Sequence, residues 1–247
     1  MILCVDIGNT QIKWAWLYQG ELSPVESCRL TQLSQAQMFD SARELQAIYV
    51  ANVAGATIME EFEVACLKTW ARIRPISIVA QEQILGLKNG YKQADSLGVD
   101  RWLAMIAVMQ MQLLPCCLIS CGTAITVDYV DVQANHLGGY ILPGSHLMSM
   151  ALNQNTQGVR AEFSSRAAWQ LGKNTQDAVN WGIFRLILAF LIELNFYKVS
   201  AIEVDIQKVM TGGGAEVFLP YLPPQFQHEP HLVIKGLSII ATHQGQS

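Results

Sequence analysis

The chain of 247 residues repeats one short pattern at its start and again near its midpoint. Residues 5–10 (VDIGNT) and residues 119–123 (ISCGT) each join an apolar run to an acidic or small residue, a glycine turn and a hydroxyl. A β-rich stretch and then helical segments follow each copy. Internal repetition of this kind indicates duplicated structural units. We therefore expect two similar halves that face one cleft.

The first half is predicted to be a β-meander followed by alternating helix and strand. The apolar run 2–5 ends at Asp6, a glycine turn follows, and Ile12, Trp14 and Trp16 then alternate with other residues. This alternation predicts a β-hairpin with an acid at its tip. The order of elements indicates an α/β half-chain. Further strands are predicted over residues 46–53 and 75–80.

The second half is predicted to return to the opening order of elements. Residues 102–114 are apolar and rich in good helix formers, and Pro115 stops this predicted helix. No linker rich in proline, serine or charge divides the halves, so we expect two closely packed lobes, residues 1–114 and 115–247. The predicted strands of the second lobe cover residues 117–120, 124–130, 136–142 and 204–210, and the last of them precedes a glycine turn at 211–214.

The low share of charge limits the partners that the chain can take. Charged residues make up 15% and hydrophobic residues 51%, the net charge is −4, and no run of Lys or Arg occurs. Nucleic-acid-binding domains usually carry a clustered basic face, so no nucleic-acid partner is expected. So little polar cover also favours an apolar patch that a second copy buries, and a homodimer is predicted.

Cysteine usage and hydropathy bear on the compartment. The six cysteines include no CxxC pair, which favours buried reduced thiols over a zinc site or a disulfide framework. The N-terminal stretch lacks a basic segment followed by an apolar one, and no uninterrupted run of about 18 apolar residues occurs. We expect a cytoplasmic protein with no membrane partner.

The first glycine turn combines the groups that a polyphosphate needs. Asp6 supplies a carboxylate, the turn at Gly8 and Asn9 exposes N–H groups, Thr10 adds a hydroxyl and Lys13 a cation. Such a set can hold phosphate oxygens together with Mg²⁺ and its bound water. Asp and Asn beside Gly are also favoured in ordinary hairpin turns. The second copy of the pattern favours the phosphate loop.

Two further glycine turns extend this prediction. Gly122 and Thr123 could receive the other side of a phosphate chain, and residues 211–214 (TGGG) could lie along a nucleoside. Glycine lets a ligand approach the backbone closely because no Cβ obstructs it. Taken singly, each turn is as readily structural. Their shared position after strands favours ligand binding.

Residues 98–101 (GVDR) precede the predicted helix, and Asp100 allows two interpretations. An acid near a helix N-terminus is commonly a cap, worth about 1 kcal/mol. The alternative is a base for an attacking hydroxyl, with Arg101 binding a carboxylate. Composition alone favours the cap. The five histidines show no metal-binding spacing and are expected in loops or the core, and Asp128 could face either the cleft or solvent.

Taken in order, these motifs resemble the type III pantothenate kinases over nearly the whole chain. The opening DxGNT is shared with many actin-like kinases, whereas GxDR followed by GTAxTxD is much more specific. The resemblance rests on residues 6–10 with Lys13, Tyr91, residues 98–101, residues 122–128, Gly138 and Gly139, Pro143 and Gly144, Asn174 and Thr175, and residues 211–213.

The resemblance implies the α/β fold of the actin, Hsp70 and sugar-kinase superfamily: two ribonuclease-H-like lobes with a central nucleotide cleft, assembled as a homodimer. It also implies ATP-dependent phosphorylation of pantothenate to 4'-phosphopantothenate in coenzyme A biosynthesis, with Asp100 as the base. ATP with Mg²⁺ would be bound by Asp6, Ile7, Gly8, Asn9, Thr10, Gln11, Ile12, Lys13 and Thr123. Pantothenate would be bound by Tyr91, Gly98, Val99, Asp100, Arg101 and, from the neighbouring subunit, Thr175.

One position departs from the family pattern. Many members carry Asp where this chain has Ser120, and that Asp helps to hold a K⁺ or NH₄⁺ ion near the phosphates. The Ser120 hydroxyl offers a neutral oxygen in place of a full negative charge. A monovalent cation is therefore still expected, but bound more weakly or in a different arrangement.

Two other functions stay open at this level. The chain could be another actin-like kinase that acts on a sugar or an acyl phosphate, or a non-catalytic, ATP-responsive accessory factor for transcription. A sugar has no carboxylate for Arg101 to bind, which favours pantothenate over a sugar. The joint presence of Asp100, Arg101 and Lys13 favours catalysis, because a binding module needs no base opposite a phosphate loop.

Overall fold

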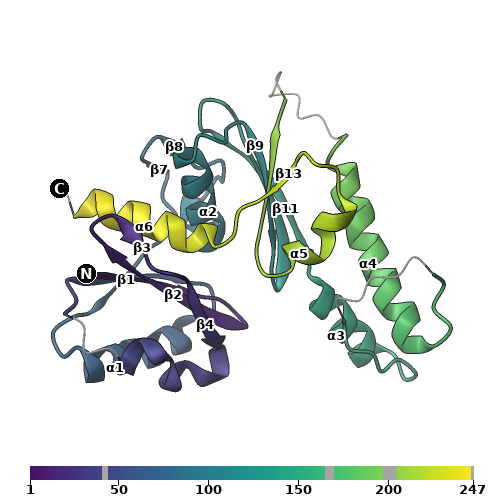
Figure 1. The fold of residues 1–247 in the computed structure, drawn as a ribbon, viewed down its shortest axis with the longest axis horizontal. Helices are drawn as coiled ribbons and strands as arrows, with labels where there is room; N and C mark the ends of the chain where they lie inside the picture. Colours follow the sequence, from purple (N-terminus) through teal and green to yellow (C-terminus); the bar gives the residue numbers. More distant parts are fainter. Residues whose placement is uncertain (41–43, 165–169, 197–204, 246–247) are drawn as a thin grey trace. The chain divides into compact units, whose positions relative to one another are not determined.

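A computed structural model describes residues 1–40, 44–164, 170–196 and 205–245 (Figure 1). The chain divides into two compact units. The chain passes from the first unit to the second between Leu113 and Leu114, one residue before the predicted boundary. The C-terminal helix groups with the first unit. The first unit comprises Met1–Leu113, Ala134–His136 and His231–Ser247, and the second comprises Leu114–Gln133 and Leu137–Pro230.

The sheet of the first unit is a meander extended by two parallel strands. Its strand order is β3-β2-β1-β5-β6, and β4 also pairs with β2. β1 runs antiparallel to β2 and parallel to β5, so it lies at the centre of the sheet. The predicted hairpin and the two later strands are confirmed. The strands are β1 (Ile2–Ile7), β2 (Gln11–Tyr18), β3 (Glu21–Leu22), β4 (Glu26–Arg29), β5 (Ala47–Asn52) and β6 (Pro75–Ser77).

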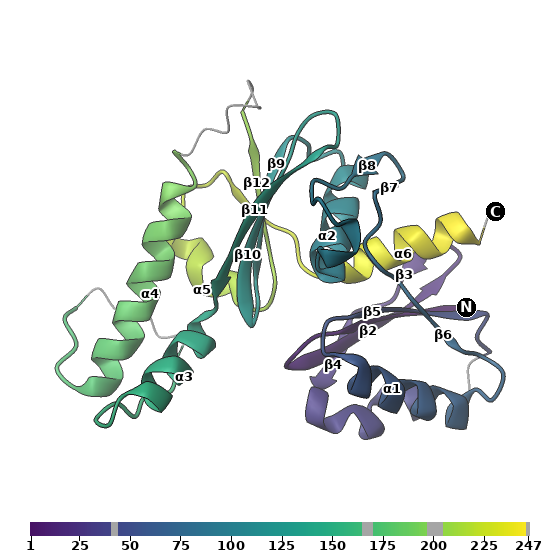
Figure 2. The ribbon, with the colours of Figure 1, turned by 180° about the vertical axis from the view of Figure 1, so that it is seen from behind.

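Helices cover both faces of this sheet (Figures 1 and 2). On one face, Phe62 and Cys66 of α1 (Ala56–Thr69) share a buried apolar cluster with Leu3 and Val5 of β1. On the other face, α6 (Leu232–Gln244) contacts β1, β2 and β5, and α2 (Val99–Gln110) contacts α6 and β5. The remaining elements of this unit are η1 (Leu30–Gln35), η2 (Gln37–Asp40), η3 (Ala94–Ser96) and the short hairpin of β7 (Gln83–Ile84) and β8 (Leu87–Lys88).

The two faces divide the residues of β1 between them. Successive side chains of a strand point to opposite faces, so Leu3 and Val5 face α1 whereas Cys4 and Asp6 face α2 and α6. α6 approaches α2 closely because Gly236 has no side chain: a Cβ there would lie 2.2 Å from the carbonyl oxygen of Leu103. Asp6 therefore lies on the side of the sheet where α2 begins.

The second unit repeats the strand order of the first. Its order is β11-β10-β9-β12-β13, with β9 antiparallel to β10 and parallel to β12. The first strand of each unit thus occupies the same central place, which confirms the predicted repeat. Residue 204, at the start of one predicted strand, lies outside the described residues. The strands are β9 (Cys116–Cys121), β10 (Ala124–Val130), β11 (His136–Pro143), β12 (Gln207–Thr211) and β13 (Phe226–His228).

Helix α4 (Thr175–Glu193) covers one face of the second sheet. Ile187 and Leu191 of α4 share a buried cluster with Ile119 of β9 and Val127 of β10. Figure 2 shows α4 and α5 on the same side of this sheet. The other helices of the unit are α3 (Ser145–Asn155), α5 (Ala215–Phe218) and η4 (Leu219–Tyr221).

The helix predicted over residues 102–114 both begins and ends earlier, as α2 over Val99–Gln110. Gln112, two residues past its end, has a φ of 59°. An α-helix of L-residues cannot contain this left-handed conformation, so the helix stops before Pro115 is reached. Among the helices of the described ranges, none is long and apolar enough to cross a membrane.

The cysteines agree with the expectation of reduced thiols. All six are free, and five of them are buried. Burial raises the pKa of the Cys4 and Cys121 thiols to about 12. Thiols with so high a pKa stay protonated at neutral pH, so they pack as small apolar side chains and do not act as nucleophiles.

Candidate active site

The turn between β1 and β2 is closed by one backbone bond and anchored by two buried side chains. Ile7 and Ile12 pair directly across the hairpin and are both inaccessible to solvent. The Gly8 N–H donates to the Gln11 carbonyl at 3.0 Å. Asn9, Thr10 and Gln11 are exposed beyond this bond. The predicted nucleotide-binding residues from 6 to 13 therefore form one hairpin whose tip is exposed at residues 9–11.

Asp6 and Lys13 lie opposite each other at the base of this tip. They are cross-strand partners in the antiparallel pairing of β1 with β2, and such partners have side chains on the same face. Both are half-buried. Because Asp6 faces α2, this pair lies on the side of the sheet where Asp100 stands in the first turn of that helix.

Burial dominates the ionisation of Asp6. Desolvation raises the pKa of the Asp6 carboxyl to about 7, with Lys13 lowering the pKa and the negative charge of Asp100 raising it. A divalent cation beside Asp6 would favour the carboxylate form that burial opposes. The Asp6 carboxyl thus fits the expected Mg²⁺. Within the described part of the chain, no group of three or more His, Cys, Asp and Glu is placed to hold a metal by itself.

The start of α2 shapes the predicted substrate loop. Gly98 is the N-cap residue and makes no side-chain cap, and Val99 begins the helix. Asp100 is therefore the second helical residue and not the N-cap; its Oδ1 accepts a bond from the Arg101 backbone N–H at 2.9 Å. A Cβ on residue 98 would lie 2.7 Å from that same Oδ1. Glycine at residue 98 therefore leaves room for the Asp100 carboxylate.

Arg101 and Tyr91 contact each other although they are ten residues apart in sequence. Arg101 is only 5% exposed, and its Nη1 donates to the Tyr91 hydroxyl oxygen at 2.7 Å. The guanidinium carbon also lies 5.4 Å from the centroid of the Tyr91 ring. Tyr91 stacks in addition on His136, which the sequence placed only in a loop or the core. No local periodicity marks that contact, because the two residues meet through tertiary packing.

Three glycine segments of the second unit pack tightly together. The Gly144 N–H donates to the Thr123 carbonyl at 3.0 Å, and the Gly214 N–H donates to the Cys121 carbonyl at 2.9 Å. A Cβ at Gly144 would lie 2.5 Å from the Gly122 oxygen, and one at Gly212 would lie 2.4 Å from the Cys121 oxygen. Only glycine permits these approaches. Gly122 and Thr123 are exposed at the centre of this group.

Ser120 lies among hydroxyl groups in the second sheet. It pairs with Thr126 of β10 and with Thr211 of β12, so the three side chains share one face. Thr126 and Thr211 are buried and Ser120 is half-buried. Asp128, on the same face by its pairing with Leu118, is 1% exposed and so does not face solvent. The face therefore holds neutral hydroxyl oxygens directly beside Ser120 and the Asp128 carboxyl one pair further along.

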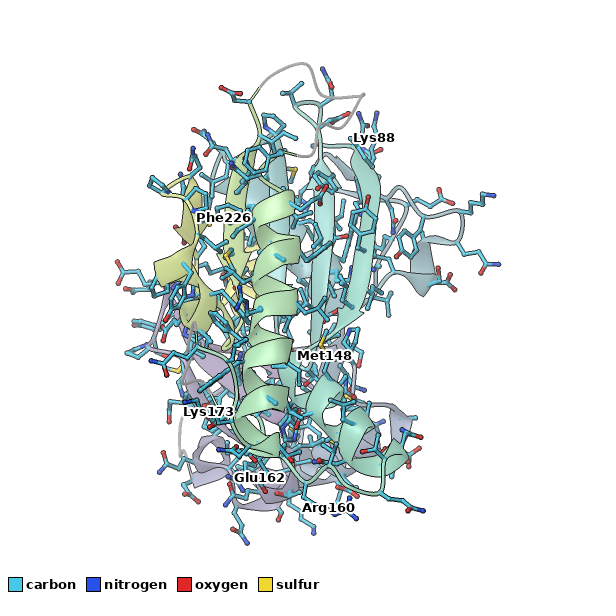
Figure 3. The ribbon with its side chains drawn as sticks, turned by 90° about the vertical axis from the view of Figure 1, so that its right-hand side faces the viewer. Lys88, Met148, Arg160, Glu162, Lys173 and Phe226 are labelled. Carbon is cyan, nitrogen blue, oxygen red and sulfur yellow. The ribbon has the colours of Figure 1, made fainter. Side chains whose placement is uncertain are left out.

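Thr175 stands apart from these glycine segments, at the first residue of α4. Asn174 caps the helix: its side-chain oxygen accepts from the Asp177 N–H at 2.8 Å. The helix start borders a hollow of about 700 Å³ lined by Thr175, Lys173 and Leu186 among others. Figure 3 shows Lys173 and Glu162 near this end of α4. Tyr91 and Arg101 belong to the other unit.

Comparison with solved structures defines the class of fold. A Campylobacter jejuni protein described as a candidate transcriptional activator of the Baf family matches with a TM-score of 0.64 at 21% identity, covering 99% of this chain and 100% of that one. A candidate 2-dehydro-3-deoxygalactonokinase from Sinorhizobium meliloti matches with a TM-score of 0.58 at 12% identity, covering 99% of each chain. The chain has the actin-like ATPase and sugar-kinase fold, with two ribonuclease-H-like lobes.

Comparison of sequences then assigns the family within this class. The sequence model of the type III pantothenate kinases matches residues 2–194. The type III pantothenate kinase of Nitrosococcus oceani is 32% identical over 250 residues, which cover 98% of this chain and 94% of the relative. The Azoarcus enzyme of the same name is 34% identical over 249 residues, covering 98% and 90%. This chain belongs to the type III pantothenate kinase family.

The raised pKa of Asp6 predicts a pH dependence of stability without nucleotide or Mg²⁺. The carboxyl has a pKa near 3.9 when unfolded and about 7 when folded. Between these values the folded state binds more protons, so stability is lost as the pH rises through this window. Asp6→Asn cannot ionise. We expect the melting temperature of Asp6→Asn, relative to that of the parent, to increase as the pH rises from 5 to 8.

Asp95→Asn, at an exposed carboxyl of the same unit, serves as the control, and no such gain is expected from it. Melting curves of the three proteins at each pH provide the measurement. An Asp6→Asn difference that is equal at both ends of the range would contradict the assigned burial of this acid.

Proposed function

We propose that this chain is an ATP-dependent kinase that phosphorylates pantothenate to 4'-phosphopantothenate, the first step of coenzyme A biosynthesis. Membership of the type III pantothenate kinase family supports the reaction and the substrate. The observation in the chain itself that carries the proposal is the contact of buried Arg101 with Tyr91 beside the Asp100 carboxylate. This contact presents a carboxylate-binding group next to a base.

Asp100 would orient the primary hydroxyl of the substrate and accept its proton. Phosphoryl transfer has a loose transition state, so a base acts mainly by positioning the attacking oxygen and takes the proton late. The N–H of Arg101 holds one carboxylate oxygen at 2.9 Å and so limits rotation of the Asp100 side chain. Its other oxygen can then accept the substrate hydroxyl.

Arg101 would bind the carboxylate of pantothenate. A guanidinium matches a carboxylate with two parallel N–H groups, and burial strengthens such a charge-assisted bond. Arg101 is 5% exposed, and one of its nitrogens is already engaged by the Tyr91 hydroxyl. This contact fixes the direction of the guanidinium, and its positive charge favours an acidic substrate over a sugar.

The phosphates of ATP would be bound by the tip of residues 6–13 and by Thr123. Asp6 would hold Mg²⁺ through its bound water, and Lys13 would add positive charge. Bound Mg²⁺ neutralises the charge of the transferred phosphoryl group. The exposed residues 9–11 of the tip would lie against the phosphate oxygens.

A second copy would complete the site. Thr175 is exposed beside the hollow at the start of α4, and Leu171 and Leu186 near it are 84% and 62% exposed. Apolar side chains gathered in this way favour burial by a partner subunit. In this proposal Thr175 reaches the pantothenate site of the neighbouring subunit. The cytoplasmic location and the absence of a nucleic-acid partner stay predictions.

A monovalent cation would be bound weakly. The hydroxyls that pair beside Ser120 belong to Thr126 and Thr211 and carry no full charge, whereas the Asp128 carboxyl lies one pair further along the same face. Neutral oxygens attract K⁺ or NH₄⁺ less than a carboxylate does.

The test of the reaction is a substrate panel of pantothenate, common sugars and acetate, read by ADP release with Mg²⁺. We expect turnover of pantothenate only, and a loss of about 100-fold to 10,000-fold in Asp100→Asn with unchanged ATP affinity and melting temperature. Asn keeps the size of Asp, and Gly98 is the N-cap, so the helix start should persist. Turnover of a sugar but not of pantothenate would contradict the assignment. So would an Asp100→Asn variant whose turnover is within a few-fold of that of the parent.

Shared sites predict complementation between two impaired variants. Asp100→Asn and Thr175→Ala are each expected to lose activity at low pantothenate concentration. A mixed dimer restores one intact site, so subunit exchange in an equal mixture should recover about a quarter of the parent activity. Sedimentation should give one species of about twice 27.4 kDa. No recovery in mixed dimers would place Thr175 in its own subunit's site or outside any site.

Ser120 predicts a small dependence on potassium. We expect Ser120→Asp to gain more from K⁺ or NH₄⁺, relative to Na⁺ buffer, than the parent does, because its carboxylate restores a charged ligand. Ser120→Asn, which is similar in size to Asp but neutral, is the control. A parent that has no activity without K⁺, together with a Ser120→Asp variant that responds to K⁺ in the same way, would contradict this account of Ser120.

A further inference from the structure

A short segment that leads from β10 into the first residue of β11 groups with the first unit, although the residues on both sides of it group with the second. It consists of Ala134–His136. The Lys88 N–H, at the end of β8, donates to the Ala134 carbonyl at 2.9 Å, and Lys88 forms a parallel β-bridge with Asn135. The segment therefore lies beside the loop that carries Tyr91.

The ring of His136 stacks on the ring of Tyr91. The ring centroids are 5.8 Å apart, the planes differ by 19°, and His136 is 3% exposed. The backbones of the two segments approach closely beside the rings: a Cβ on Gly90, just before Tyr91, would collide with the His136 carbonyl oxygen. A glycine thus permits the close approach that brings the rings together.

The remaining contacts of Tyr91 connect this stack to the substrate loop. The Tyr91 N–H donates to the Asn89 side-chain oxygen at 2.9 Å, which holds the backbone of the residue. The Tyr91 hydroxyl oxygen accepts from Arg101 Nη1 at 2.7 Å. His136 on one ring and Arg101 at the hydroxyl therefore leave the phenol little freedom to rotate.

We propose that His136 is a positioning residue for the carboxylate-binding group of Arg101. By stacking on Tyr91 it sets the plane of the phenol, and the phenol oxygen sets the direction of the guanidinium. His136 does not touch the substrate in this account. The proposal rests on the proposed function, in which Arg101 binds the carboxylate of pantothenate. It goes beyond that function by assigning a role to the segment that leads from β10 into β11.

Steady-state kinetics separate this role from a merely structural one. In His136→Leu, which keeps the volume but loses the ring, we expect the KM for pantothenate to rise by about 3-fold to 10-fold, the range of one aromatic stack. The KM for ATP and the melting temperature should change little. His136→Phe keeps a stacking face and should return the KM for pantothenate to within about 3-fold of the parent. His243→Ala, at an exposed histidine of α6, is the matched control.

Gly90→Ala disturbs the same stack from the side of the Tyr91 loop. Its Cβ would displace the His136 carbonyl, so the variant should also raise the KM for pantothenate and spare the KM for ATP. If His136→Leu does not fold, Gly90→Ala and His136→Phe still decide the question. An unchanged pantothenate KM in folded His136→Leu or Gly90→Ala, or a rise of both KM values together with a lower melting temperature, would overturn the positioning role.

A spectroscopic readout distinguishes failure of this inference from failure of the proposed function. In protein labelled with 3-fluorotyrosine, the ¹⁹F resonance of Tyr91 is assigned by its absence in Tyr91→Phe. His136→Leu should move this resonance through loss of the ring-current shift, and His136→Phe should retain a shift. If the parent does not phosphorylate pantothenate but the Tyr91 resonance differs between the variants as predicted, only the proposed function is contradicted. A Tyr91 resonance that is the same in parent and His136→Leu overturns the positioning role whatever the substrate.

Discussion

The antiparallel pairing of β1 with β2 decides which side chains of the first turn can act together. It sets Asp6 opposite Lys13 and, because strand side chains alternate, turns both toward the face that α2 and α6 cover. A slip of one residue would move Asp6 into the apolar cluster beneath α1, among Leu3 and Val5. The burial of that cluster therefore holds the register, and the register holds the acid in place.

The same constraint recurs in the second unit, where β9 takes the central position that β1 has in the first. Here the turn is held by backbone contacts at Gly144 and Gly212, which leave no room for a Cβ. A buried pair closes the base of each turn, Ile7 with Ile12 in the first and Cys121 with Ile125 in the second, and the second is also packed against glycines. The shared strand order is common to both, and the local chemistry of each turn differs.

Charge in the first unit is arranged at some cost to stability. Asp6 is half-buried, and desolvation raises its pKa to about 7 against the opposing effect of Lys13. Arg101 is buried as well, with its guanidinium on the Tyr91 hydroxyl. Buried charges of this kind are costly to desolvate, and they are commonly found at sites that bind charged ligands. A cation beside the acid and a carboxylate beside the arginine would each be attracted by the charge already present.

The sequence by itself determined the strands, the central hairpins, the glycine turns and the repeat, because alternation and glycine act over a few neighbouring residues. Only the tertiary structure decided that α6 packs on α2 through Gly236, that Gly98 and not Asp100 caps α2, and that His136 meets Tyr91. Two of these contacts join segments that are far apart in the chain. The third depends on the single residue at which the helix begins. Local sequence patterns carry no information on these contacts, because they are set by the close packing of the whole chain.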